Sequence, residues 1–174
     1  MTRRWTADDI PSLAGRIAVV TGANSGLGLE TSRALARSGA QVILACRDPE
    51  RAQAAVREVA QAAPRADAVS SLALDLASLA SVRAFAEAFR ARHASLDLLV
   101  NNAGVMAIPD RPTVDGFERQ LGTNHLGHFA LTGLLLDRLL ATPGARVVTV
   151  SSSVHRIGRI DFEDLHGRRR YRPR

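Results

Sequence analysis

The feature that most constrains the fold is a repeated alternation of short apolar runs with segments of helical periodicity. Four of the runs are followed by a helical pattern, and each run has the length of a buried strand. The runs cover residues 17–20, 42–45, 69–74, 96–100 and 147–150. The helical patterns cover residues 27–37, 49–59, 78–89 and about 117–140. This order is typical of an α/β protein with a doubly wound parallel sheet and helices on both faces.

The alternation continues without a linker, a repeat or a low-complexity segment, so it predicts one domain over residues 1–174. Within it, residues 1–15 form an N-terminal arm and residues 156–174 an arginine-rich tail. The tail follows the fifth run without a further strand-like or long helical pattern. We therefore expect a sheet that is incomplete at its C-terminal side.

Composition excludes several classes of protein. All 23 basic residues are arginines, so a Schiff-base or phosphate-binding lysine is impossible. Cys46 is the single cysteine and cannot form an internal disulfide. No apolar stretch approaches the roughly 20 residues that cross a bilayer, and the N-terminus has no apolar signal region. These features predict a cytoplasmic protein without a membrane span.

A glycine-rich loop follows the first strand and opens the first helix. Such a loop lets the backbone approach a pyrophosphate, which the helix N-terminus attracts. A plain strand-to-helix turn is the alternative. The spacing G-x-x-x-G-x-G differs from the general dinucleotide fingerprint, and no lysine follows it as in a P-loop. The candidate cofactor-binding residues here are Gly22, Asn24, Ser25, Gly26, Leu27 and Gly28.

Arg47, at the end of the second strand, bears on the choice of cofactor. An acidic residue there would bind a ribose 2′-hydroxyl, whereas an arginine suits a 2′-phosphate. The neighbouring Asp48 carries the opposite charge, but its side chain can cap the helix that begins at Pro49. A solvated surface arginine is the alternative reading of Arg47. The pattern favours NADP(H) over NAD(H).

Further motifs occur in a fixed order after the strands, and with them the chain resembles the short-chain dehydrogenase/reductase family. The motifs are Asp75-Leu76, Asn101-Asn102-Ala103-Gly104, Asn124 in the long helical region, and Ser152 after the fifth strand. Details such as residues 44–47, 124–129 and 152–160 resemble the retinol dehydrogenase-like branch. The resemblance covers nearly the whole chain and implies a Rossmann-type fold.

The resemblance also implies roles for these residues. Asp75 would lie near the adenine. Asn101, Ala103 and Gly104 would line the cofactor, and Leu76 would also belong to the cofactor site. Ser152 and Asn124 would be catalytic. Each has a plain alternative, since Asp75 can cap a turn and the asparagines can belong to an ordinary loop. The implied activity is hydride transfer between NADP(H) and a small-molecule alcohol or carbonyl, in a full-length form that is a homo-oligomer.

The family's general base is missing from this sequence. The family uses a Tyr-x-x-x-Lys motif, in which a positive charge favours the tyrosinate. The only tyrosine, Tyr171, lies in an arginine-rich segment that precedes the catalytic tyrosine in the similar branch, and its motif lysine would fall beyond position 174. We therefore expect a fragment that is inactive by itself. The resemblance also implies that the family's next helix and two further strands are missing, which would leave the fifth strand as an exposed edge. A non-catalytic dinucleotide-binding protein, complete at this length, is the alternative.

Two other functions receive less support. The arginines of the tail could attract nucleic-acid phosphates, but no aromatic residues interleave with them and no reader motif is present, which favours a solvated basic loop. His125 and His128 share a helical face at ligand spacing, but no cysteine or carboxylate obviously completes a metal site. The sequence therefore predicts no nucleic-acid partner and no metal, and it explains the histidines by helix packing.

Overall fold

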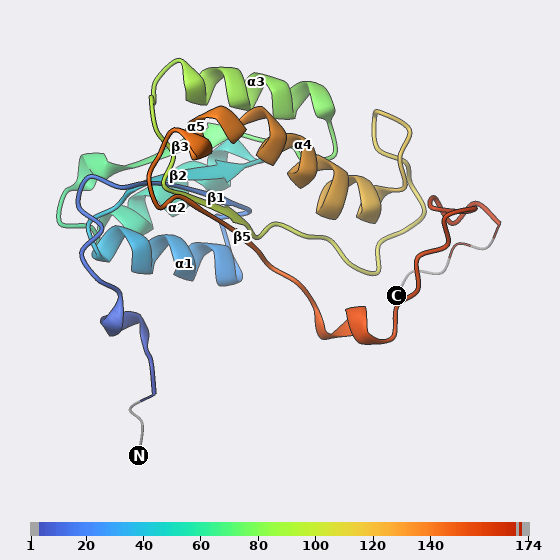
Figure 1. Ribbon diagram of the computed structural model, residues 1–174, viewed down its shortest axis with the longest axis horizontal. Helices are drawn as coiled ribbons and strands as arrows, with labels where there is room; N and C mark the ends of the chain where they lie inside the picture. Colours follow the sequence, from blue (N-terminus) through green and yellow to red (C-terminus); the bar gives the residue numbers. More distant parts are fainter. Residues whose placement is uncertain (1–3, 170, 172–174) are drawn as a thin grey trace.

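A parallel sheet forms the centre of the protein in the computed structural model, which describes residues 4–169 and 171. Its strand order is β3-β2-β1-β4-β5, so β1 lies between the first and second halves of the winding (Figure 1). This order confirms the predicted Rossmann-type doubly wound sheet. The strands are β1 (Ile17–Thr21), β2 (Gln41–Cys46), β3 (Val69–Ala73), β4 (Leu98–Asn101) and β5 (Arg146–Thr149).

Helices cover both faces of the sheet (Figure 1). On one face lie α1 (Gly26–Arg37) and α2 (Pro49–Ala60); on the other lie α3 (Leu79–Arg90), α4 (Gly127–Leu134) and α5 (Leu136–Leu140). The core is accordingly divided into two apolar layers. Phe89, Leu99 and Leu131 are fully buried in one layer, and Val42 and Val59 in the other.

Two helices begin where the sequence predicts. Asp48 precedes α2, and its carboxylate accepts a hydrogen bond from the Arg51 amide at 3.0 Å. Ser78 precedes α3, and its hydroxyl oxygen accepts one from the Ser81 amide at 3.3 Å. Both side chains satisfy backbone donors that have no partner within the helix. Short 3-10 turns complete the secondary structure at Ala7–Asp9, Ala66–Ala68 and Ser153–Arg156.

The buried face of α1 is shifted by one residue from the apolar face that the sequence suggests. Helical spacing in this segment puts Leu27 on the apolar face of the helix, but the Leu27 side chain is 73% exposed. The buried residues are Gly28, Ser32 and Ala36. The Ser32 hydroxyl donates to the Gly28 carbonyl at 2.8 Å, so its polar group is satisfied inside the helix. Small side chains occupy the buried face because they let the helix backbone approach the sheet closely.

The single long helix expected over 117–140 is interrupted. Residues 113–117 form a turn, with the Thr113 amide bonded to the Phe117 carbonyl at 2.8 Å, so helical structure starts after them. The first part is a π-helix, η3 (Leu121–Leu126), and a second break at Leu135 separates α4 from α5. π-helical turns are rare and are found mostly at functional sites. Asn124, a predicted site residue, lies within this one.

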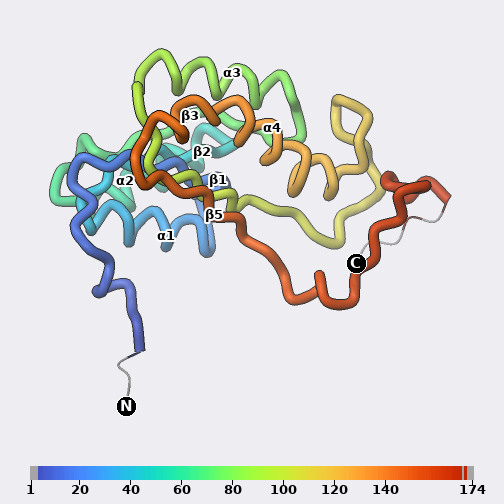
Figure 2. The backbone as a smooth tube through the Cα atoms, in the orientation of Figure 1, coloured from blue at the N-terminus to red at the C-terminus, as the bar shows by residue number. Residues whose placement is uncertain are grey.

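The strand β5 is an edge of the sheet, as predicted, and its Val147 and Val148 are 43% and 46% exposed. The chain then leaves the sheet and runs toward the loop that precedes η3 (Figure 2). There the Tyr171 hydroxyl donates to the Ile108 carbonyl at 2.7 Å, and the Glu118 amide donates to His166 Nδ1 at 3.1 Å. Residues 1–3 of the predicted arm and 170 and 172–174 of the predicted tail lie outside the described residues.

Candidate functional site

A pocket of about 780 Å³ lies at the carboxyl ends of strands β1 to β4. The chain winds from β1 to β2 and β3 on one side and then crosses to β4 on the other. This crossing leaves a crevice beyond the strand ends, which is where open α/β sheets bind ligands. Residues proposed from the sequence that line the pocket are Gly22, Asn24, Ser25, Arg47, Asp75, Leu76, Ala103 and Gly104.

Two glycines allow the loop after β1 to pack against the loop after β4. Gly22 has a φ of +65°, and a Cβ there would lie 2.9 Å from the Ala103 Cβ. A Cβ on Gly28 would lie 2.5 Å from both the Asn102 Nδ2 and the Gly22 carbonyl oxygen. Larger residues would therefore push the two loops apart. The close packing of the two loops in the pocket wall therefore explains the spacing of these glycines.

Four of the proposed cofactor-binding residues do not line the pocket. Gly26 and Leu27 are exposed at the start of α1, whereas Gly28 is buried behind the loop. Asn101 is buried at the end of β4, where its Nδ2 donates to the Thr132 hydroxyl at 3.2 Å. The Asn101 Oδ1 has no hydrogen-bond partner among the described residues. Of the four, only Gly28 and Asn101 are buried behind the pocket wall.

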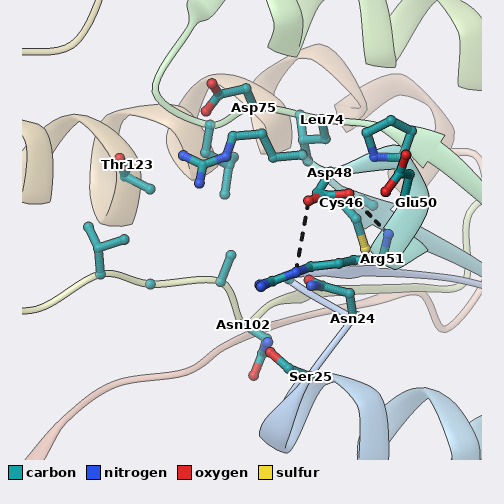
Figure 3. A pocket seen from close by; sticks show the side chains of 18 residues that line it. Asn24, Ser25, Cys46, Asp48, Glu50, Arg51, Leu74, Asp75, Asn102 and Thr123 are labelled. Carbon is teal, nitrogen blue, oxygen red and sulfur yellow. Dashed lines mark hydrogen bonds and ion pairs between the residues drawn. The ribbon is translucent and has the colours of Figure 1, made fainter. Parts of the chain in front are cut away.

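Charged residues gather where β2 passes into α2. Arg47 and Arg51 both line the pocket, and Figure 3 shows the Arg51 side chain extending into it beside Asn24. Asp48 is engaged by the helix start, and its second oxygen lies 3.9 Å from the Arg51 Nε. The predicted capping role of Asp48 is thus confirmed. Sequence reasoning missed Arg51, although its place one helical turn after Arg47 could have revealed it.

Asp75 and Cys46 complete this end of the pocket. One oxygen of Asp75 accepts from the Ala77 amide at 2.9 Å, which is the turn-capping role left open by the sequence, and Asp75 also lines the pocket. Burial raises the pKa of the Cys46 thiol, and hydrogen bonds from the Ala23 and Asn24 amides act in the opposite direction. A neutral thiol therefore forms part of the wall.

The two proposed catalytic residues lie outside the pocket lining. The Asn124 Nδ2 donates to the Val105 carbonyl and its Oδ1 accepts from the Val105 amide, both at 2.8 Å. Ser152 is exposed after β5, and its Oγ accepts from the Val154 amide at 3.3 Å. Asn124 thus holds the loop that follows β4. Its neighbour Thr123 lines the pocket.

Tyr171 does not have the surroundings of a catalytic base. Its hydroxyl is bonded to the Ile108 carbonyl. Partial burial raises the pKa of Tyr171, and the carboxylates of Glu118 and Asp110 raise it further. A tyrosine that acts as a base requires the opposite shift, because the phenolate must be accessible near neutral pH. The structure thus agrees with the view that Tyr171 precedes the family's catalytic position.

Comparison with known proteins decides the family. The sequence profile of short chain dehydrogenases matches residues 16–163. The chain belongs to the short-chain dehydrogenase family. It is 50% identical to retinol dehydrogenase 12 of Mus musculus over 163 residues, which covers 91% of this chain and 50% of that protein. The chain thus spans about half the length of the curated relatives it matches.

Solved structures share the fold. A protein from Mycobacterium paratuberculosis is 53% identical with a TM-score of 0.83, over 97% of this chain and 58% of that one. The Pseudomonas aeruginosa RhlG/NADP active-site complex is 33% identical with a TM-score of 0.69, over 81% of this chain and 56% of that one. The retinol dehydrogenase-like resemblance and the oxidoreductase family are both confirmed.

The relatives overturn one expectation. Retinol dehydrogenase 12 is named for retinol, a water-insoluble alcohol that partitions into membranes, and this contradicts the predicted cytoplasmic location. The prediction was wrong because it used the single cysteine and the lack of an apolar stretch and of a signal region, and none of these excludes association with a membrane. Among the helices of residues 4–169, none is long and apolar enough to cross a membrane. The same residues contain no cluster of three or more His, Cys, Asp or Glu side chains placed to hold a metal.

Proposed function

We propose that this chain carries the NADP(H)-binding part of a short-chain oxidoreductase that interconverts an alcohol and its carbonyl compound. The pocket at the crossing of the strands is the observation that carries the proposal, because its wall requires glycine at two close approaches. Gly22, Asn24 and Ser25 would hold the pyrophosphate. A nicotinamide dinucleotide, when bound, would supply or accept the hydride.

The preference for NADP(H) rests on the charges at the end of β2. Arg47 and Arg51 line the same part of the pocket. The Oδ1 of Asp48 accepts from the Arg51 amide, and its Oδ2 lies 3.9 Å from the Arg51 Nε, so this carboxylate is turned toward α2. The two arginines would bind a 2′-phosphate through charge-assisted hydrogen bonds. A relative of known structure, RhlG, is described as an NADP complex.

The substrate side belongs to Ser152 and Asn124 in this proposal. Ser152 already accepts from the Val154 amide, so its hydroxyl hydrogen remains available to a substrate oxygen. Asn124 would support the reacting end by holding Val105. The sequence holds no lysine for a Tyr-x-x-x-Lys motif. We therefore propose that residues 1–174, one dinucleotide-binding domain, bind the cofactor without turnover, and that a full-length form works as a homo-oligomer.

Reversal of the side-chain charge at position 47 tests the cofactor proposal. Arg47→Asp should weaken NADPH binding by roughly 10-fold or more, the range expected for loss of a hydrogen bond to a charged group. NADH affinity should stay the same or rise. Arg57→Asp is the matched control, because it makes the same charge change on the exposed side of α2, near its end. Affinities for both cofactors follow from titrations of nicotinamide fluorescence.

The outcomes separate the parts of the proposal. Equal loss for NADPH and NADH, or no loss for either, would remove the case for the 2′-phosphate. Failure of the unaltered chain to bind either cofactor would remove the dinucleotide site itself. Oxidation of an added alcohol by the chain with NADP⁺, followed at 340 nm, would refute the proposed lack of turnover. Cofactor binding by a natural product of only 174 residues would instead support the non-catalytic alternative.

A further inference from the structure

A buried histidine joins three parts of the site. His128 lies in α4 and is 4% exposed, and its Nε2 is 2.8 Å from the Oγ1 of the fully buried Thr21. Its Nδ1 is 2.9 Å from the carbonyl oxygen of Asn124. Thr21 ends β1, and Asn124 lies in the π-helix. Both ring nitrogens are therefore used, one toward the end of β1 and the other toward the π-helix.

The partners fix the direction of every hydrogen bond in this cluster. The Asn124 carbonyl can only accept, so the His128 Nδ1 carries a proton and donates. Burial lowers the pKa of His128, so the ring is neutral and its Nε2 is an acceptor. The Thr21 hydroxyl consequently donates to Nε2. The other acceptor within reach of this hydroxyl, the Val100 carbonyl, is farther away at 3.4 Å.

The Thr21 oxygen then has both lone pairs free, and the loop after β4 uses them. The amides of Asn102 and Ala103 each donate to the Thr21 Oγ1 at 2.9 Å. The Asn102 side chain also donates to the Thr21 carbonyl at 2.8 Å. Asn102 and Ala103 both line the pocket. The direction of a single hydroxyl therefore determines whether two backbone amides of the pocket wall are satisfied.

We propose that His128 is a positioning residue of the dinucleotide site, which aims the Thr21 hydroxyl and so holds the Asn102–Ala103 turn in its cofactor-binding shape. The residue touches no part of the pocket surface and acts through Thr21. Its second bond fixes the Asn124 carbonyl, while the Asn124 side chain holds Val105. The loop after β4 is thus held at two points that both depend on one ring. The effect on cofactor binding rests on the proposed function, but the effect on the loop does not.

Amide hydrogen exchange without cofactor is the decisive measurement. His128→Phe keeps a ring of similar size but offers no acceptor, so the Thr21 hydroxyl must turn to Val100 and its lone pairs leave the two amides. We expect the Asn102 and Ala103 amides to exchange at least roughly 10-fold faster, while amides of β2 keep their wild-type rates. His128→Gln, whose carboxamide can accept and donate at once, should restore rates to within about threefold. His125→Gln is the control, because His125 is an exposed residue of η3.

A second variant keeps the test independent of the folding of His128→Phe. Thr21→Val removes the shared oxygen and should accelerate the same two amides. Adding His128→Phe to it should change nothing further at those positions, since both substitutions break one chain of bonds. With NADPH, His128→Phe should raise Kd roughly 10-fold and His128→Gln much less, as read by nicotinamide fluorescence.

Each result has one meaning. Unchanged exchange at Asn102 and Ala103 in His128→Phe overturns the proposal. Equal acceleration of these amides and those of β2 also overturns it, because it marks general loss of stability. A third result is that the wild-type chain binds no NADPH while His128→Phe still accelerates exchange at the two amides. That pair of observations would establish the positioning of the loop and refute the proposed cofactor. Altered exchange with unchanged NADPH affinity would refute the link from His128 to cofactor binding.

Discussion

Replacing Gly28 by alanine tests the close packing on which the candidate site depends. The new Cβ would lie 2.5 Å from the Asn102 Nδ2 and from the Gly22 carbonyl oxygen. The Asn102 Nδ2 itself donates to the Thr21 carbonyl at 2.8 Å, so neither neighbour can move freely. Overpacking of this kind costs about 1–3 kcal/mol. For a domain of this size each kcal/mol lowers Tm by about 2–4 °C, so a cost of about 2 kcal/mol predicts a fall of roughly 4–8 °C.

Gly133→Ala is the matched control for this change. Gly133 lies in α4, is exposed, and has nothing within 4 Å of a built Cβ. The same substitution there should stabilise the protein by up to about 1 kcal/mol, because alanine forms helix better than glycine. Thermal unfolding by circular dichroism gives both values, and fluorescence titration should show weaker NADPH binding for Gly28→Ala alone. A Gly28→Ala protein that melts and binds like the wild type would refute the packing argument.

Two further predictions follow from side chains near the pocket. Asp48→Ala should lower the free energy of unfolding by about 1 kcal/mol in urea denaturation, because α2 loses its cap, and yet strengthen NADPH binding because a negative charge leaves the pocket. A weaker NADPH affinity would contradict the electrostatic part. Burial lowers the pKa of His128, and the charge of His125 acts in the same direction. The folded-state pKa of His128 thus lies below the unfolded value near 6.5. The stabilisation contributed by the neutral, buried His128 ring is therefore complete above pH 6.5 and is lost as the pH falls through the folded pKa. Tm measured from pH 8 to 5 should therefore fall more for the wild type than for His128→Gln, and parallel curves would contradict the assignment.

Much of the fold could be predicted from periodicity because apolar strands and capped helices are local signals. Pro49 and Ser78 mark helix starts that the structure confirms. The inner face of α1 could not be predicted this way. The sequence favours the apolar Leu27, whereas the structure buries Gly28, because proximity of the backbone to the sheet outweighs the hydrophobicity of one side chain. The break at Leu135 likewise has no proline to mark it, and Gly133, two residues earlier, still lies within α4.

The residues of the candidate site were likewise only partly predictable from the sequence. Motifs at strand ends mark the pocket, because the carboxyl ends of parallel strands meet at one edge, and Arg47 and Asp75 are found there. Arg51, which follows Arg47 in the sequence by one turn of chain, and Asn102, which is next to Asn101, were missed because side-chain direction depends on the turn that follows each strand. Ser152 and Asn124 are given their roles by family resemblance, and neither lines the pocket.

The sequence by itself determined the alternation of strands and helices and the glycine turn, since each of these depends on residues that are close in the chain. It determined the family as well, because the order of such local motifs along the chain can be read directly. It also determined that no lysine is available to a catalytic motif. Only the tertiary structure joined His128 to Thr21, which are 107 residues apart. A lone histidine on a helix carries no signal of its partner, because the partner is chosen by the packing of α4 against the sheet. The tautomer of His128, and with it the order of the pocket wall, is therefore a property of the fold.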